Sequence, residues 1–91
     1  MTAREIAEQA LPGLVWREDY KDARTTFLGT KLFVGYSEST EDWFAHHKFP
    51  GFGPFEGADI CRSQDPMIVS KELRKYVMRL RLAMTKALKK V

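Results

Sequence analysis

The C-terminal segment constrains the fold most, because its apolar residues recur at the spacing of a long helix. Asp65-Pro66 supplies an N-cap carboxylate followed by a proline suited to the first helical position. A helix from there to the C-terminus would be about 37 Å long. Its apolar residues form one stripe, which we expect to pack on a sheet. The stripe consists of Val69, Leu73, Tyr76, Val77, Leu80, Met84, Ala87, Leu88 and Val91.

The opposite side of this helix carries lysines and two apolar residues. Met78 and Leu82 lie one turn apart and point away from the stripe. One interpretation is that they are two scattered surface residues, which are common. The other is a small apolar patch with a cationic rim, which suits a second helix from another copy or from an acidic partner. The lysines of this side are Lys71, Lys75, Lys86, Lys89 and Lys90.

The N-terminal segment predicts a short helix. Thr2 and Glu5 have the spacing of a capping box, in which hydroxyl and carboxylate satisfy backbone N–H groups reciprocally. Apolar residues then follow helical spacing through Ala10, and Pro12-Gly13 ends the helix.

The middle of the chain predicts strands over 14–20, 24–28, 31–36 and 43–49, with a brief edge strand over 58–61. Gly29-Thr30 suits a type II′ hairpin, although one long strand with a bulge at Gly29 fits equally. The whole chain, residues 1–91, is therefore expected to be a single α+β domain. It would have a short N-terminal helix, a three- to four-stranded antiparallel sheet, and a long C-terminal helix across one sheet face.

Residues 49–55 form the palindrome Phe-Pro-Gly-Phe-Gly-Pro-Phe. Proline and glycine keep this stretch out of helices and central strands. Phe49, Phe52 and Phe55 must therefore fold back over the core or meet a partner. We expect Phe49 to cover one end of the sheet, and Phe52 to be a partner anchor if it is exposed.

Charge is divided unevenly along the chain. Residues 71–91 hold eight basic side chains and one acid, Glu72, whereas residues 1–70 hold 7 basic and 11 acidic side chains. The basic end favours an acidic protein partner, or nucleic acid as the alternative. Single-strand binding would use the helix with Trp43 or the loop phenylalanines as stacking surfaces. No Asn or Gln lies between Lys71 and Val91 to read bases.

Chemical motifs are sparse. His46 and His47 are adjacent and, on a strand, point to opposite faces, so they cannot easily share a metal ion. Cys61 is the single cysteine and has no second cysteine at ligand spacing. The neighbouring Arg62 could lower its thiol pKa, and a histidine could act as its base, so a small enzyme or metal protein centred on His46, His47 and Cys61 is a third hypothesis, which no local motif supports. The acids Glu38, Glu41 and Asp42 suit a solvated turn. The sequence therefore predicts no catalytic residues, no cofactor and no metal.

In its size, aromatic content and charge division the chain resembles small accessory proteins of phages and mobile elements, including inhibitors that occupy a host protein's surface. We therefore expect a non-enzymatic protein-binding module, as a homodimer or on an acidic partner. The lone cysteine and the absence of a long apolar run favour the cytoplasm over a membrane. The predicted contact residues are Phe49, Phe52, Phe55, Lys71, Lys75, Met78, Leu82 and Lys86.

Overall fold

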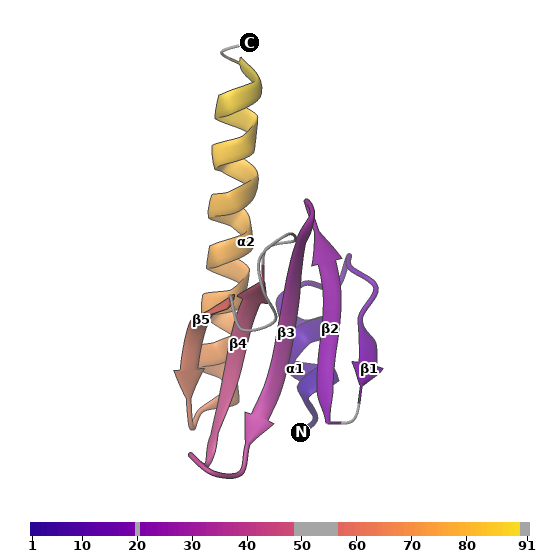
Figure 1. The fold of residues 1–91 in the computed structure, drawn as a ribbon, viewed down its shortest axis with the longest axis vertical. Coiled ribbons are helices and arrows are strands. Elements are labelled where there is room, and N and C mark those ends of the chain that lie inside the picture. Colours follow the sequence, from indigo (N-terminus) through magenta and orange to yellow (C-terminus); the bar gives the residue numbers. More distant parts are fainter. Residues whose placement is uncertain (20, 49–56, 90–91) are drawn as a thin grey trace.

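The computed structural model describes residues 1–19, 21–48 and 57–89. In this part of the chain two helices accompany an antiparallel sheet whose strands are ordered as in the sequence (Figure 1). The elements are α1 (Ala3–Ala10), β1 (Arg17–Asp19), β2 (Asp22–Phe27), β3 (Thr30–Ser37), β4 (Asp42–Lys48), β5 (Gly57–Ser63) and α2 (Pro66–Lys89).

The α+β class is confirmed, but the predicted three or four strands are too few, since the described sheet has five. The fifth strand is β5, which the sequence indicates only as a brief edge strand over 58–61 and which extends over seven residues. The first strand is shorter than its predicted range and contains only three residues. Leu14 and Trp16 nevertheless point toward the core as predicted, and Val15 points to solvent.

Both helix starts follow the predicted capping chemistry. The Thr2 hydroxyl accepts from the Glu5 backbone N–H at 3.2 Å, and the Glu5 carboxylate accepts from the Thr2 N–H at 3.2 Å. At α2, the Asp65 carboxylate accepts from the Met67 N–H at 2.9 Å. These contacts satisfy N–H groups that have no partner within the helix.

The β2–β3 connection is a hairpin and not a bulged strand. Its two-residue loop is Leu28-Gly29, one position earlier than predicted. Leu28 and Gly29 have φ values of 51° and 78°. Positive φ at both positions is typical of a type I′ turn, so the predicted type II′ geometry is wrong.

The core lies between one face of the sheet and the two helices. Ile6 of α1, Leu32 and Val34 of β3, and Val69 and Leu73 of α2 are its largest fully buried side chains. Figure 1 shows both helices on the same side of the sheet, and they also contact each other. No described helix packs on the opposite side, which we call the open face.

Strand β4 shows the division between the two faces most clearly. Ala45 and His47 point toward the helices, and Phe44, His46 and Lys48 point to the open face, as the alternation predicts. The His47 ring stacks on Tyr76 of α2, with centroids 5.1 Å apart and planes 19° apart. This contact joins the sheet to the long helix.

The prediction that the apolar stripe of α2 packs along its whole length is wrong. Its residues are covered as far as Leu80, whereas Ala87 is exposed and Leu88 is 73% exposed. The cause is length: 24 helical residues extend about 36 Å, and the seven residues of β5 extend about 23 Å. The segment 81–89, which we call the distal segment, therefore projects beyond the sheet (Figure 1). Val91 and the side chain of Met84 lie outside the described residues.

Neither described helix combines the length and apolar character needed to cross a bilayer.

The orientation of α2 predicts different costs for two leucine truncations on the same helix. Leu73→Ala removes a fully buried side chain, so the free energy of unfolding should fall by about 2–5 kcal/mol. Leu82→Ala, the matched control at an exposed position, should change it by less than about 0.5 kcal/mol. Urea unfolding monitored by circular dichroism measures both. Equal costs would contradict the observed helix orientation.

His47 predicts a loss of stability in mild acid. Burial and the neighbouring His46 lower the pKa of His47 below its ordinary 6.5, so the unfolded chain takes up this proton more readily than the folded chain. Stability should therefore fall as the pH drops from 6.5 toward the lower pKa of the folded state. His47→Phe keeps an aromatic ring on Tyr76 and cannot titrate. Its unfolding free energy should decline less than the wild type's between about pH 7 and 5. Parallel declines would refute the assignment to His47.

Candidate protein-binding site on helix α2

Met78 and Leu82 lie on the side of α2 that faces away from the sheet. They are 59% and 55% exposed, as the helical spacing predicts. Together with Arg79, Arg81 and Thr85 they line a hollow of about 310 Å³. The Thr85 hydroxyl donates to the Arg81 carbonyl at 2.9 Å, which turns this side chain back onto the helix. We call this surface, made by Met78, Arg79, Arg81, Leu82 and Thr85, the outer face of α2.

A second hollow, of about 390 Å³, adjoins the first. It lies between α2 and the segment that follows α1, where Leu11, Pro12 and Leu14 form the opposite wall. Met78 and Arg81 line both hollows. The outer face of α2 therefore continues into an apolar groove against the body of the protein. Sequence reasoning missed this groove, although the apolar Leu11 and Leu14 around Pro12-Gly13 were a signal for it.

Few of the cationic side chains around these hollows form ion pairs with described carboxylates of the chain. Lys75 forms an ion pair with Glu72, at 3.5 Å. Among the described residues, no carboxylate lies within ion-pair distance of the other α2 cations whose side chains the structure describes. These are Lys71, Arg74, Arg79, Arg81 and Lys86, and all are exposed.

The distal segment has apolar side chains on more than one side. Leu82 belongs to the outer face, and Leu88 lies on the continuation of the buried stripe. Short helices without tertiary contacts are marginal in water. A partner that covers these leucines would therefore stabilise the distal segment as well as bind to it.

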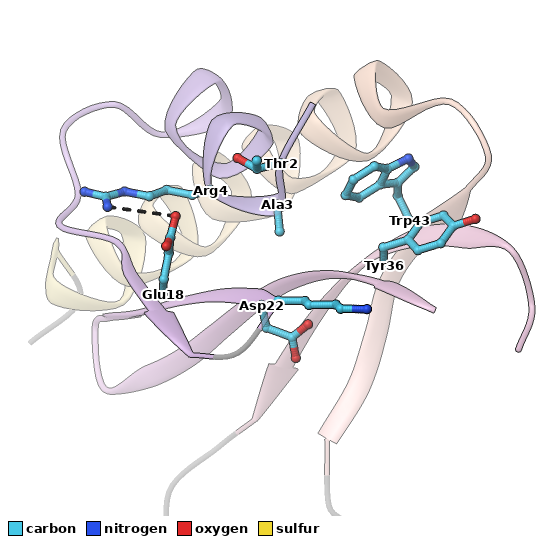
Figure 2. Close-up of a pocket in the computed structure, with 8 residues that line it drawn as sticks. Thr2, Ala3, Arg4, Glu18, Asp22, Tyr36 and Trp43 are labelled. Atoms are coloured by element: carbon cyan, nitrogen blue, oxygen red, sulfur yellow. Dashed lines mark ion pairs between the residues drawn. The ribbon is translucent and has the colours of Figure 1, made fainter. Parts of the chain in front are cut away.

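A hollow of about 360 Å³ at the start of α1 shows no catalytic arrangement (Figure 2). Tyr36 and Trp43 form one wall, with ring centroids 4.9 Å apart. On the other side, Arg4 lies 2.8 Å from Glu8 and 4.0 Å from Glu18. The hydrogen bond and charge of Glu8 raise the pKa of Arg4. Among the described residues, no hydroxyl or thiol in this hollow contacts a base.

The two histidines point to opposite faces of the sheet, as predicted. His46 points to the open face, with Nδ1 3.3 Å from Asp59, whereas His47 faces α2. Burial, and secondarily Glu72, raise the pKa of Cys61, so its thiol stays protonated near neutral pH. The described residues contain no group of three or more side chains placed to hold a metal ion.

The hypothesis that Arg62 activates Cys61 is wrong. The Arg62 guanidinium lies on the open face, where it donates to Asp42 and Asp59, each at 3.2 Å. It also lies over the Phe44 ring, 5.3 Å from the centroid. Adjacent strand positions point to opposite faces, so this cation is directed away from the thiol.

The predicted contact residues have different outcomes. Met78 and Leu82 share one surface, and Lys71, Lys75 and Lys86 are exposed on the same helix. Phe49, Phe52 and Phe55 lie outside the described residues. The turn that carries Glu38 and Glu41 is exposed as predicted, and Glu38 pairs with Lys21 at 2.6 Å.

Comparison of the chain with protein-family models, with curated proteins and with solved structures finds no match.

Proposed function

We propose that the chain is a non-enzymatic binding module that takes an acidic amphipathic segment of a partner protein on the outer face of α2. The observation that supports this most directly is the exposure of Met78 and Leu82 in two adjoining hollows bordered by cations. An apolar centre with a charged rim is the usual composition of a protein interface.

The charge of α2 favours an acidic partner over a second copy of this chain. From residue 71 onward eight basic side chains accompany one acid. Pairing two outer faces would bring like charges together, which is unfavourable in a partly desolvated interface. A segment with Leu, Ile or Met on one side and Asp or Glu beside them would fill the hollows and neutralise the rim.

The same surface is poorly suited to nucleic acid. Its centre is aliphatic, and Tyr76, the aromatic residue of α2, is already stacked on His47. Bases are held mainly by stacking on aromatic rings or by polar side chains that read their edges. The lysines and arginines would then orient and accelerate docking of an acidic protein.

A module of this kind acts by occupying a surface of its partner. An accessory protein of a phage or mobile element that inhibits or modulates a host protein in the cytoplasm would act in this way, and we include that role in the proposal. The marginal distal segment supports it, because binding on the outer face would bury Leu82 and order this helix at the same time.

The test uses two synthetic helical peptides of about 18 residues with identical leucine positions. One carries Glu at its polar positions and the other carries Lys. We expect the Glu peptide to bind, more weakly as salt rises, and the Lys peptide not to bind. Met78→Asp with Leu82→Asp should reduce binding of the Glu peptide at least about tenfold, because it places carboxylates in the apolar centre. Isothermal titration calorimetry measures each affinity.

Val15→Asp is the control variant, because Val15 is 80% exposed and lines neither of the two hollows beside Met78. It should bind the Glu peptide as the wild type does. The proposal would be contradicted if the Glu and Lys peptides bound equally, or if the double variant bound the Glu peptide as tightly as the wild type does.

Light scattering over a concentration series tests the predicted homodimer. Self-association that the double variant abolishes would assign the outer face to a second copy.

A further inference from the structure

We propose that the open face of the sheet binds single-stranded nucleic acid. This surface lies on the other side of the molecule from the helices and is independent of the function proposed for α2. The strand registers place its side chains in rows across the sheet. These rows contain Arg17, Arg24, Lys31, Phe33, Phe44, His46, Lys48 and Arg62.

Two rows at one end of this face bring like charges together. Arg17 of β1 lies directly opposite Arg24 of β2, and Lys31 of β3 lies directly opposite Lys48 of β4. Directly opposed like charges destabilise a sheet. Such a local conflict with stability is typical of a functional site, and four cations in neighbouring strands suit a polyanion.

An aromatic ring lies within this cationic region. Phe33 is paired across the sheet with Arg24 on one side and His46 on the other. Its ring is half-buried and meets His46 edge-on, with centroids 6.0 Å apart. The face of an aromatic ring on an open sheet is a platform on which an unpaired base can stack.

The surface beside Phe33 is hollowed. A cavity of about 440 Å³ is lined by Phe33, by the cations Arg17, Arg24 and Lys31, and by Val15, Thr25 and Thr26. A base stacked on Phe33 would place its sugar and phosphate over the cations. The Thr26 hydroxyl, on the same face as Lys31, adds a donor and an acceptor for the same backbone.

The described acids of the open face border this region on two sides, and Asp59 lies 3.3 Å from His46. Asp42 and Asp59 are each paired with Arg62 at 3.2 Å, near the β5 edge. Asp22 lies beside Gly35 at the opposite end of β2 from Thr26. Among the described residues, no carboxylate forms an ion pair with Lys31 or Lys48, so these two lysines can meet a phosphate backbone.

Phe44 is a less suitable platform than Phe33, because the Arg62 guanidinium already covers its ring. The geometry therefore points to one principal stacking position with phosphate contacts on either side. This predicts sequence-tolerant binding that prefers single strands, since a paired base cannot stack on a side chain.

The experiment measures fluorescence anisotropy with labelled mixed-sequence single-stranded DNA, single-stranded RNA and duplex DNA, each at several salt concentrations. We expect salt-sensitive binding of at least one single strand and weaker binding of the duplex. Comparison of the DNA and RNA arms shows which strand is preferred.

Lys31→Glu is the decisive variant. It replaces a like-charge pair with an opposite-charge pair across from Lys48, so thermal stability should stay the same or rise. Affinity should nevertheless fall at least about tenfold, and the slope of log affinity against log salt should shrink by about 0.7 or more. Lys86→Glu makes the same charge change on α2 and should weaken binding much less than Lys31→Glu does, because Lys86 acts only through long-range charge that salt screens. Phe33→Leu keeps an apolar side chain and should weaken binding about fivefold or more.

Absence of salt-sensitive binding to either single strand would overturn the proposal. Loss of binding in Lys86→Glu, with binding retained in Lys31→Glu, would also overturn it and would place nucleic acid on the basic helix. Tighter binding of duplex than of single strands would exclude the stacking position on Phe33.

Discussion

The contact between the buried stripe of α2 and the core governs which surfaces the protein exposes. Val69, Leu73 and Val77 are buried where the sheet and α1 lie beside α2. Beyond Leu80 the described side chains of α2 are exposed, because the strands end there. Both helices lie on one side of the sheet, where α1 packs against α2. A chain of 91 residues cannot also cover the second side, so the same packing that forms the core leaves the open face uncovered by any described helix.

The two uncovered surfaces differ in chemistry, although both are basic. The outer face of α2 has a flexible aliphatic centre made by Met78 and Leu82, and methionine adapts to irregular apolar partners. The open face has a rigid aromatic ring, Phe33, fixed by its cross-strand neighbours. The two surfaces therefore suit different ligands. An aliphatic side chain of a partner fits the outer face of α2, and a planar base stacks on Phe33 of the open face.

Local features were predictable from the sequence, and non-local ones were not. The caps at Thr2 and Asp65, the inward residues of α1 and the alternation of β4 follow from contacts within a few residues. How far along α2 the sheet buries the apolar stripe depends on the length of strands elsewhere in the chain. Helical spacing alone therefore predicted wrongly that Leu88 is buried. The opposition of Lys31 and Lys48 depends on the register between β3 and β4. No pattern within either strand indicates that pairing.

The two proposed sites can be occupied together, because the sheet separates them. The groove beside Met78 is bounded by Leu11 and Leu14 on the helix side, whereas Lys31 and Phe33 point away from that side. The β2–β3 turn and the distal segment nevertheless lie at the same end of the molecule (Figure 1). Their positive charges therefore add at that end, and a polyanion on the open face would lower the potential that an acidic partner meets at α2. The two ligands should consequently bind with weak mutual antagonism at low salt, and this coupling should vanish as salt shortens the range of the charges.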